Sequence, residues 1–244
     1  MKILKKPINN SWVFVRDYDD VSREFICKDL KEKILSTQVW FSDLDDSDAD
    51  SPAKLIAKKA IGTSHFSLRY ISWCCGTAKD LLFKCKNSES ARWKKYVEKF
   101  LRTDKAVKGL EALFTPEFVQ TSLYPSVEIF YSLLSAHKFY ISRNVLPITQ
   151  AYSNFLNFAG VYCEEDNKGE VVENFIKNHP QFVKYGISGD SVEDEAMVDV
   201  LNYYAKIGKI DVISCYISGN KYWESSKFDI QISKDRRGLL EIIS

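Results

Sequence analysis

The chain has 244 residues, of which 45% are hydrophobic and 27% charged, so it is long enough to bury a substantial core and is unlike a disordered polypeptide. Its 34 basic and 33 acidic residues leave a formal net charge of +1, which excludes a polyanion binder or an acidic mimic that acts through bulk charge. The N-terminus lacks the apolar stretch of a signal peptide, and about 18 consecutive apolar residues occur nowhere, so we expect a soluble, cytoplasmic protein.

The chain opens with a strand signal and then a helix signal. Residues 12–15 are aromatic and β-branched, which favours a short strand. The next apolar residues recur at helical spacing and predict a helix with an apolar stripe of Phe25, Ile26, Leu30 and Ile34. Residues 39–41 are a brief apolar segment after that helix, for which we expect only an anchoring role.

The most concentrated acidic run of the chain follows and consists of Asp43, Asp45, Asp46, Asp48 and Asp50. The last three are spaced like the first ligands of an EF-hand calcium loop. The comparison then fails, because Ser51 stands where that loop needs glycine and Ala57 where it needs glutamate. We therefore favour a solvated, mobile acidic loop, in which the carboxylates repel one another, over the alternative of a weak cation site.

The six cysteines are scattered, contain no CxxC pair and predict no disulfide framework. Cys74 and Cys75 lie in an apolar helical pattern, so we interpret them as small core residues. The alternative is a metal site that combines them with His65 and Cys85. On one continuous helix His65 and Cys85 would lie about 30 Å apart, which no single ion bridges.

The clearest amphipathic helix is predicted for residues 89–102. Its apolar face is aromatic, and its opposite face carries a basic ridge, which we define as Arg92, Lys95, Lys99 and Arg102. A solvated helix face is the simplest interpretation, whereas binding to phosphates or to an acidic protein is the sharper one. Residues 84–108 hold nine basic and three acidic residues, and residues 164–199 hold ten acidic and three basic ones, so the neutral total conceals separated patches.

Residues 124–162 hold the longest run of apolar and aromatic residues at helical spacing. Between Ile129 and Ile141 these side chains recur three and four positions apart, which predicts one helix. Pro147 interrupts the pattern, and Thr149 is placed to cap a second helix that carries Tyr162 near its end. We expect these two helices to form the centre of a helical core.

A polar segment at residues 163–170 is the best candidate for a domain boundary. We expect a short helix over residues 171–178 and a loop over residues 186–190. Ser191 and Asp194 then suggest a capping box at the start of another helix.

The character of the chain changes after Gly208, which is placed to end that helix. Residues 210–217 and 228–232 are β-branched and apolar, and turn residues lie between them. This pattern predicts a terminal β-hairpin.

No catalytic motif stands out. P-loop, GxGxxG and zinc-deaminase patterns are all absent. His137 shares a predicted helix face with apolar residues, which favours a core histidine over a catalytic one, and His179 precedes a proline without a visible partner. A metal-dependent nuclease site that uses Asp211, Asp229 and Lys234 is an alternative.

Together these patterns predict a mainly α protein, an irregular multi-helix bundle with a small C-terminal β-hairpin. Residues 1–163 would form a helical core domain with a short N-terminal strand. Residues 164–244 would form a C-terminal segment of helix plus β-hairpin that packs on this core.

The function follows only by elimination. We expect a non-catalytic protein-binding module, such as an adaptor, inhibitor, immunity or chaperone-like protein, that acts through its segregated acidic and basic patches. The alternative is a nucleic-acid-binding or metal-dependent nuclease component that uses the basic ridge, and an enzyme with an unfamiliar site is a third hypothesis. We assign no catalytic residue, metal ligand or cofactor, and we expect a protein partner, with nucleic acid as the alternative and no membrane.

Overall fold

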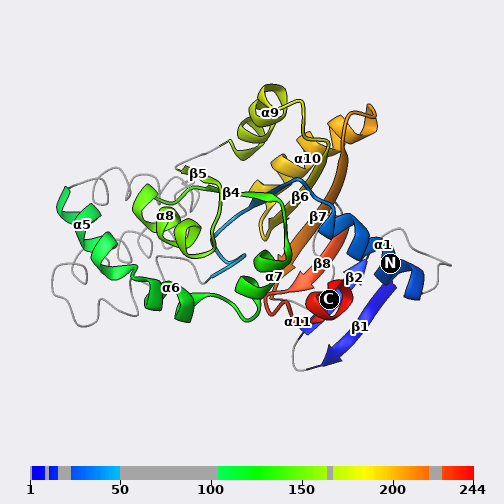
Figure 1. Cartoon of the computed structure of the whole chain (residues 1–244), viewed down its shortest axis with the longest axis horizontal. Helices are drawn as coiled ribbons and strands as arrows, with labels where there is room; N and C mark the ends of the chain where they lie inside the picture. Colours follow the sequence, from blue (N-terminus) through cyan, green and yellow to red (C-terminus); the bar gives the residue numbers. More distant parts are fainter. Residues whose placement is uncertain (1, 9–10, 16–22, 50–103, 164–166, 220–226) are drawn as a thin grey trace, which may run out of the picture.

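The computed structural model describes residues 2–8, 11–15, 23–49, 104–163, 167–219 and 227–244. These residues form one eight-stranded sheet with helices on both of its faces (Figure 1). The architecture is therefore α/β, and the predicted mainly α bundle with a small hairpin is wrong.

The strands of the sheet follow the order β1-β2-β8-β7-β6-β3-β4-β5. Six adjacent strands of this sheet run parallel to one another. They are β3 (Val39–Ser42), β4 (His137–Ser142), β5 (Gly160–Cys163), β6 (Lys184–Gly189), β7 (Asp211–Ser218) and β8 (Ile230–Ser233). Antiparallel strands β2 (Ser11–Val15) and β1 (Lys2–Ile8) extend the sheet beyond β8.

Strand β3 marks the point where the sheet changes its direction of growth. The chain adds β4 and β5 on one side of β3, and then returns to add β6, β7 and β8 on the other side. At such a switch point of a parallel sheet, the connections leave the carboxyl ends of the strands in opposite directions and open a crevice in which ligands bind. The topology thus singles out the carboxyl ends of β3 and its neighbours.

Two helical layers cover the sheet. One layer consists of α9 (Lys168–Asn178) and α10 (Val192–Lys206), which lie above the sheet in the view of Figure 1. The other face is covered by α1 (Arg23–Leu35), α7 (Val127–Leu133), α8 (Leu146–Phe155) and α11 (Arg237–Ile243). Helices α5 (Asp104–Leu113) and α6 (Pro116–Ser122) pack on α8.

The apolar segment at residues 39–41 is a central strand rather than an anchor. Val39 and Phe41 are buried with side chains of α9 and α10, whereas Trp40 is buried in the opposite layer. Successive side chains of a strand point to opposite faces of the sheet. A strand that is buried on both faces therefore has apolar residues at consecutive positions. The Trp40 ring also packs across β6, where a Cβ on Gly186 would lie 2.0 Å from a ring atom.

The single helix predicted between residues 129 and 141 is two elements. Helix α7 ends at Leu133, and β4 begins at His137. In β4 the helical spacing gives way to strand alternation, since Tyr140 packs in one layer and Ile141 in the other. Pro147 lies in the first turn of α8 instead of ending a helix, because backbone N–H groups of the first turn have no partner within the helix and proline lacks only such a group.

The predicted C-terminal hairpin is also wrong. Strands β7 and β8 are neighbours, but they run parallel, with Cys215 paired to Ile230. The expected loop at residues 186–190 is mostly strand β6. Composition identified β7 and β8 as strands, but it holds no information on their relative direction.

Several local predictions are confirmed. The strand at residues 12–15 lies within β2, and three of the four residues of the predicted apolar stripe, Ile26, Leu30 and Ile34, are fully buried on α1, whereas Phe25 is 58% exposed. Helix α10 begins with a capping box of Ser191 and Asp194. Gly208 follows that helix in a left-handed conformation, with φ of 71°.

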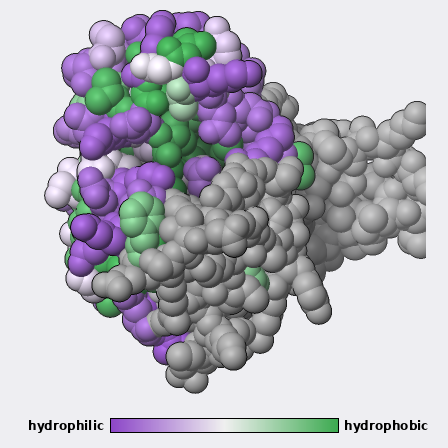
Figure 2. All heavy atoms as spheres, turned by 90° about the vertical axis from the view of Figure 1, so that its right-hand side faces the viewer, coloured by the Kyte–Doolittle hydropathy of each residue, from purple (hydrophilic) through white to green (hydrophobic). Residues whose placement is uncertain are grey.

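Both predicted domains contribute to the one sheet. Strands β3, β4 and β5 precede residue 164, and β6, β7 and β8 follow it. Among the described residues no helix is long and apolar enough to cross a bilayer. Figure 2 shows hydrophobic residues interspersed among hydrophilic ones on the described part of the visible face.

Candidate active site

Polar side chains collect at the carboxyl edge of the parallel strands, beside the switch point. We call them the carboxyl-edge cluster, and they are Asp43, Asp45, Ser142, Lys168, Asp190 and Asp194. They lie at or within three residues of the ends of β3, β4 and β6, or in the first turns of α9 and α10. Residues far apart in the sequence therefore meet where an α/β fold normally places its ligand.

Lys168 links two carboxylates in the protein interior. Its Nζ lies 2.9 Å from Oδ1 of Asp43 and 2.6 Å from Oδ1 of Asp194, and 3% of its side chain is exposed. Burial disfavours the charged amine, but the two carboxylates outweigh burial and raise the pKa of Lys168. Burial also raises the pKa of Asp43 well above its ordinary value, although Lys168 opposes this effect. One ammonium group thus compensates the charge of two buried carboxylates.

The turn between β6 and α10 fixes the orientation of Asp194. Its Oδ2 accepts hydrogen bonds from the backbone N–H groups of Asp190 at 2.9 Å and of Ser191 at 3.1 Å, and from the Ser191 hydroxyl at 2.9 Å. A Cβ on Gly189 would lie 2.5 Å from Cβ of Asp194. Glycine at the end of β6 therefore lets Asp194 fold back over the strand, with Oδ1 directed to Lys168.

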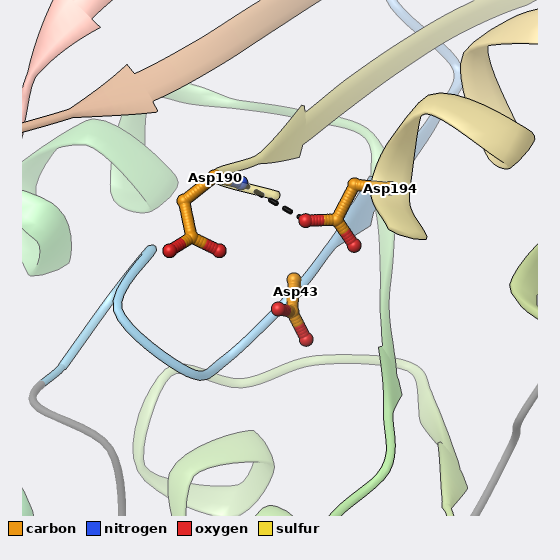
Figure 3. A group of neighbouring side chains, drawn as sticks. All are labelled: Asp43, Asp190 and Asp194. Atoms are coloured by element: carbon orange, nitrogen blue, oxygen red, sulfur yellow. Dashed lines mark hydrogen bonds between the residues drawn. The ribbon is translucent and has the colours of Figure 1, made fainter. Parts of the chain in front are cut away.

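Three carboxylates surround one small space, as Figure 3 shows. Asp43, Asp190 and Asp194 each offer an oxygen atom, and these atoms lie within 4.8 Å of one another. Burial and then repulsion by Asp194 raise the pKa of Asp190 to about 8. Hard divalent cations such as Mg²⁺ prefer oxygen ligands of this kind, and one would supply the positive charge that Lys168 alone does not. These residues therefore fit a magnesium site.

Asn144 borders the cluster just after β4 and connects Asp45 with Ser142. The amide Nδ2 of Asn144 donates to Oδ1 of Asp45 at 2.6 Å and to Oγ of Ser142 at 3.2 Å, and the Asn144 backbone N–H donates to the same Oγ at 3.1 Å. Burial raises the pKa of Asp45 to about 6, although the Asn144 hydrogen bond opposes this. Asp45 is thus a carboxyl group that can gain or lose a proton near neutral pH.

A buried network supports the loop that carries Asp43 and Asp45. Asp48 is fully buried and accepts hydrogen bonds from Arg236 at 2.5 Å, from the Tyr140 hydroxyl at 2.7 Å and from the Tyr131 hydroxyl at 3.0 Å. Arg236 immediately precedes α11. A segment near the end of the chain therefore anchors the loop after β3.

Asp43 and Asp48 of the acidic run lie in the interior, and Asp45 and Asp46 are partly buried, so the predicted solvated loop is wrong for these described residues. Asp43 and Asp48 are 5% and 0% exposed. Mutual repulsion suggested a solvated loop, but Lys168 and Arg236 approach from distant parts of the chain and compensate these two charges. Those partners are invisible to any local analysis of charge.

The basic ridge of Arg92, Lys95, Lys99 and Arg102 lies outside the described residues, as do His65, Cys74, Cys75 and Cys85. These interpretations stay predictions. His137 is not in a helix but begins β4, at the end of the strand opposite to Ser142. His179 caps α9, where its Nδ1 lies 2.9 Å from the carbonyl oxygen of Phe175.

The residues of the alternative nuclease site do not converge. Asp211 begins β7, whereas Lys234 follows the end of the parallel strand β8, so the two lie at opposite ends of the sheet. Asp229 accepts hydrogen bonds from the backbone N–H and hydroxyl of Ser214 at 2.8 and 2.7 Å. Lys234 pairs instead with Asp46 at 2.9 Å.

Sequence reasoning missed the carboxyl-edge cluster as a site. The available signal was a short, buried run followed within three residues by an aspartate, which occurs at residues 39–41 before Asp43 and at residues 185–187 before Asp190. This signal has meaning only if both runs are identified as parallel strands. Lys168 carries no comparable signal, because it lies in the polar segment that was expected to be a boundary.

No protein-family model and no curated protein matches the chain. Several solved structures are similar. DsGPDH of Dunaliella salina has a TM-score of 0.60 and 14% identity, and the match covers 88% of this chain and 37% of that one. A phospho-aspartyl intermediate analogue of phosphoserine phosphatase has a TM-score of 0.54 and 14% identity, with 85% and 97% covered. Cytosolic 5′-nucleotidase IIIB bound to cytidine has a TM-score of 0.57 and 12% identity, with 95% and 92% covered.

At these identities the likeness concerns the fold, and this chain spans little more than a third of DsGPDH. The shared fold is α/β, and phosphatase and nucleotidase structures are among those that have it. Together with the buried cluster, this finding overturns the expected helical, protein-binding adaptor. The cluster is assembled from separate strand ends, so no local motif in the sequence reveals it.

Proposed function

We propose that this protein is a magnesium-dependent phosphohydrolase that cleaves phosphate monoesters with Asp43 as its nucleophile. The observation that carries the proposal is the convergence of the carboxyl-edge cluster at the switch point of the sheet. Phosphoryl transfer requires mainly the positioning of reactants and the compensation of negative charge. The cluster offers a nucleophile, a group that exchanges protons, a hydroxyl donor, an ammonium group and a fitting cation site.

Asp43 is suited to the role of nucleophile, because Lys168 holds its carboxylate at the end of β3. In the first step an oxygen of Asp43 bonds to phosphorus, the bond from phosphorus to the ester oxygen breaks, and Asp45 gives its proton to that oxygen. In the second step water attacks the aspartyl phosphate, Asp45 takes a proton from the water, and the Asp43 carboxylate is released with inorganic phosphate. The sum is one ester and one water converted to one alcohol and one phosphate.

The remaining residues compensate the charge of the phosphoryl group. Ser142 is positioned to donate its hydroxyl hydrogen to a phosphoryl oxygen, and Lys168 contributes positive charge beside Asp43. Asp43, Asp190 and Asp194 would hold Mg²⁺, which when bound supplies further positive charge to the phosphoryl oxygens. Such preorganised charge is the main source of catalysis in phosphoryl transfer.

Two of the similar structures support this chemistry. One is a phosphoserine phosphatase in a phospho-aspartyl intermediate analogue, and the other is a 5′-nucleotidase with bound cytidine. Both names describe the removal of phosphate from a small organic molecule, and the first places the phosphoryl group on an aspartate. We extend only the class of reaction to this chain.

The test is hydrolysis of p-nitrophenyl phosphate by the purified protein with Mg²⁺ and with EDTA. We expect turnover with Mg²⁺, loss of turnover in EDTA, and loss by a factor of at least about 10³ in Asp43→Asn, since a missing nucleophile leaves little catalysis. Asp211→Asn is the matched control, because Asp211 is exposed and begins β7 away from the cluster. Equal activity in Asp43→Asn and Asp211→Asn would overturn the proposal.

A further inference from the structure

Asn144 occupies an unusual place between two functional groups. It lies two residues beyond the end of β4 and is fully buried. One amide nitrogen contacts both Asp45, which follows β3, and Ser142, which ends β4. On the basis of the proposed function, we infer that Asn144 is a positioning residue that aims the proton of Asp45 at the leaving group and the hydroxyl of Ser142 at the phosphoryl group.

The hydrogen-bond inventory fixes the orientation of the Asn144 amide. The amide nitrogen of Asn144 faces Oδ1 of Asp45, so this oxygen accepts a hydrogen bond and the proton of Asp45 falls to Oδ2. Nδ2 carries two hydrogens, and its two partners are Asp45 at 2.6 Å and Ser142 at 3.2 Å. Both donor positions of the amide are thereby used on groups of the cluster.

The same inventory sets the direction of the Ser142 hydroxyl. Its oxygen has two lone pairs, and it accepts one hydrogen bond from Asn144 Nδ2 and another from the Asn144 backbone N–H at 3.1 Å. Within the described part of the chain its hydrogen meets no acceptor. The hydrogen therefore points away from Asn144 and is free to bind an oxygen of the substrate.

The amide oxygen of Asn144 supplies the second observation. Oδ1 is buried and has no hydrogen-bond partner among the described residues. Buried polar atoms are almost always paired, and an exception calls for an explanation. An apolar side chain of similar size would fill this position without an unpaired oxygen. The presence of an amide is explained if its two N–H groups are needed for Asp45 and Ser142.

This role differs from that of a residue that only stabilises the fold. If Asn144 aims Asp45, its loss weakens proton donation to the leaving oxygen, and this harms substrates with basic leaving groups more than those with acidic ones. If Asn144 only stabilises the fold, its loss lowers the amount of active enzyme and slows all substrates equally. The dependence of rate on the leaving group therefore separates the two roles.

The experiment measures kcat/KM for a series of substituted phenyl phosphates and one alkyl phosphate, with the full chain and Mg²⁺. For Asn144→Leu we expect a loss of about tenfold with p-nitrophenyl phosphate and of about 10²–10³ with the alkyl phosphate, within the range that general acid catalysis contributes. Asp45→Asn should show the same steepening, and adding Asn144→Leu to it should steepen the dependence no further. Asn174→Leu, on the exposed side of α9, should match the wild type.

Asn144→Ala provides a second variant of smaller volume, with the same expected steepening, in case the leucine side chain disturbs the fold. A uniform loss across the series in the folded variant would overturn the role of Asn144. An inactive wild type would instead overturn the proposed function itself, so the two failures are distinguishable.

Discussion

Replacement of Lys168 by methionine tests the electrostatic account of the site. Methionine keeps most of the length of the side chain and removes its charge. The two short contacts from Nζ to Asp43 and Asp194, at 2.9 and 2.6 Å, are then lost, and their carboxylates stay buried. The variant therefore leaves a group of acids without its internal cation.

The expected destabilisation follows from what each carboxylate retains. Removal of one partner of a buried ion pair costs about 3–5 kcal/mol. Asp194 keeps three hydrogen bonds to its Oδ2, so the uncompensated charge falls mainly on Asp43. We therefore expect a loss near the lower end, about 3 kcal/mol, which for a chain of this size lowers Tm by about 6–12 °C. Activity should fall by about 10²–10³, as when one donor to a developing negative charge is removed.

The assay is urea denaturation in EDTA and again in Mg²⁺, together with steady-state kinetics. Lys177→Met is the matched control on the same helix, because Lys177 forms an exposed ion pair with Glu173 and its side chain is 55% exposed. That exposed pair is worth at most about 1 kcal/mol. Mg²⁺ should recover part of the stability lost in Lys168→Met, since it binds the native carboxylates. Equal stability and activity of the two variants would refute the electrostatic reasoning.

Three further outcomes are expected. Gly189→Ala should lower kcat/KM by about 10²-fold in a protein that still folds by circular dichroism, because the added methyl group displaces Asp194; full activity would contradict the stated need for glycine. In EDTA the free energy of unfolding should decrease as the pH rises from about 4 to about 8. Burial raises the pKa of Asp190 to about 8, so in this range the folded state binds more protons than the unfolded state does. Asp190→Asn should flatten this slope in urea titrations, and an unchanged slope would assign it to other groups. Arg236→Met should cost about 3–5 kcal/mol in the same titrations, because Asp48 stays buried without its cation, and a cost below about 1 kcal/mol would show that the tyrosine hydroxyls suffice.

Local structure was predictable where the signal is local. The capping box of Ser191 and Asp194 and the helix end at Gly208 depend on neighbouring residues only, and both are confirmed. Strands covered on both faces carry no such signature. Residues 39–41 and 139–141 are short apolar runs that periodicity does not separate from pieces of a buried helix.

The site was less predictable than the fold, because its chemistry depends on long-range pairing. Asp43 looks like one of several solvated aspartates until β3 is placed in the middle of the sheet. Lys168 and Ser142 are ordinary residues until α9 and β4 bring them to the same edge. Asp194 was identified from the sequence as part of a capping box. In the structure its Oδ1 also accepts a hydrogen bond from Lys168 of the cluster. One side chain therefore carries a local signal and a distant role.

The position of β3 within the sheet also bears on how the protein is made. This strand is synthesised early, but residues 43–136 precede its neighbour β4 and residues 43–183 precede its other neighbour β6. Closing such long loops is entropically unfavourable, and a native state dominated by distant pairings forms slowly. Arg236, which anchors the loop after β3, emerges from the ribosome later still. We therefore expect a nascent chain to hold Asp43 long before the carboxyl-edge cluster is assembled, so the proposed phosphate-ester site forms only late in folding.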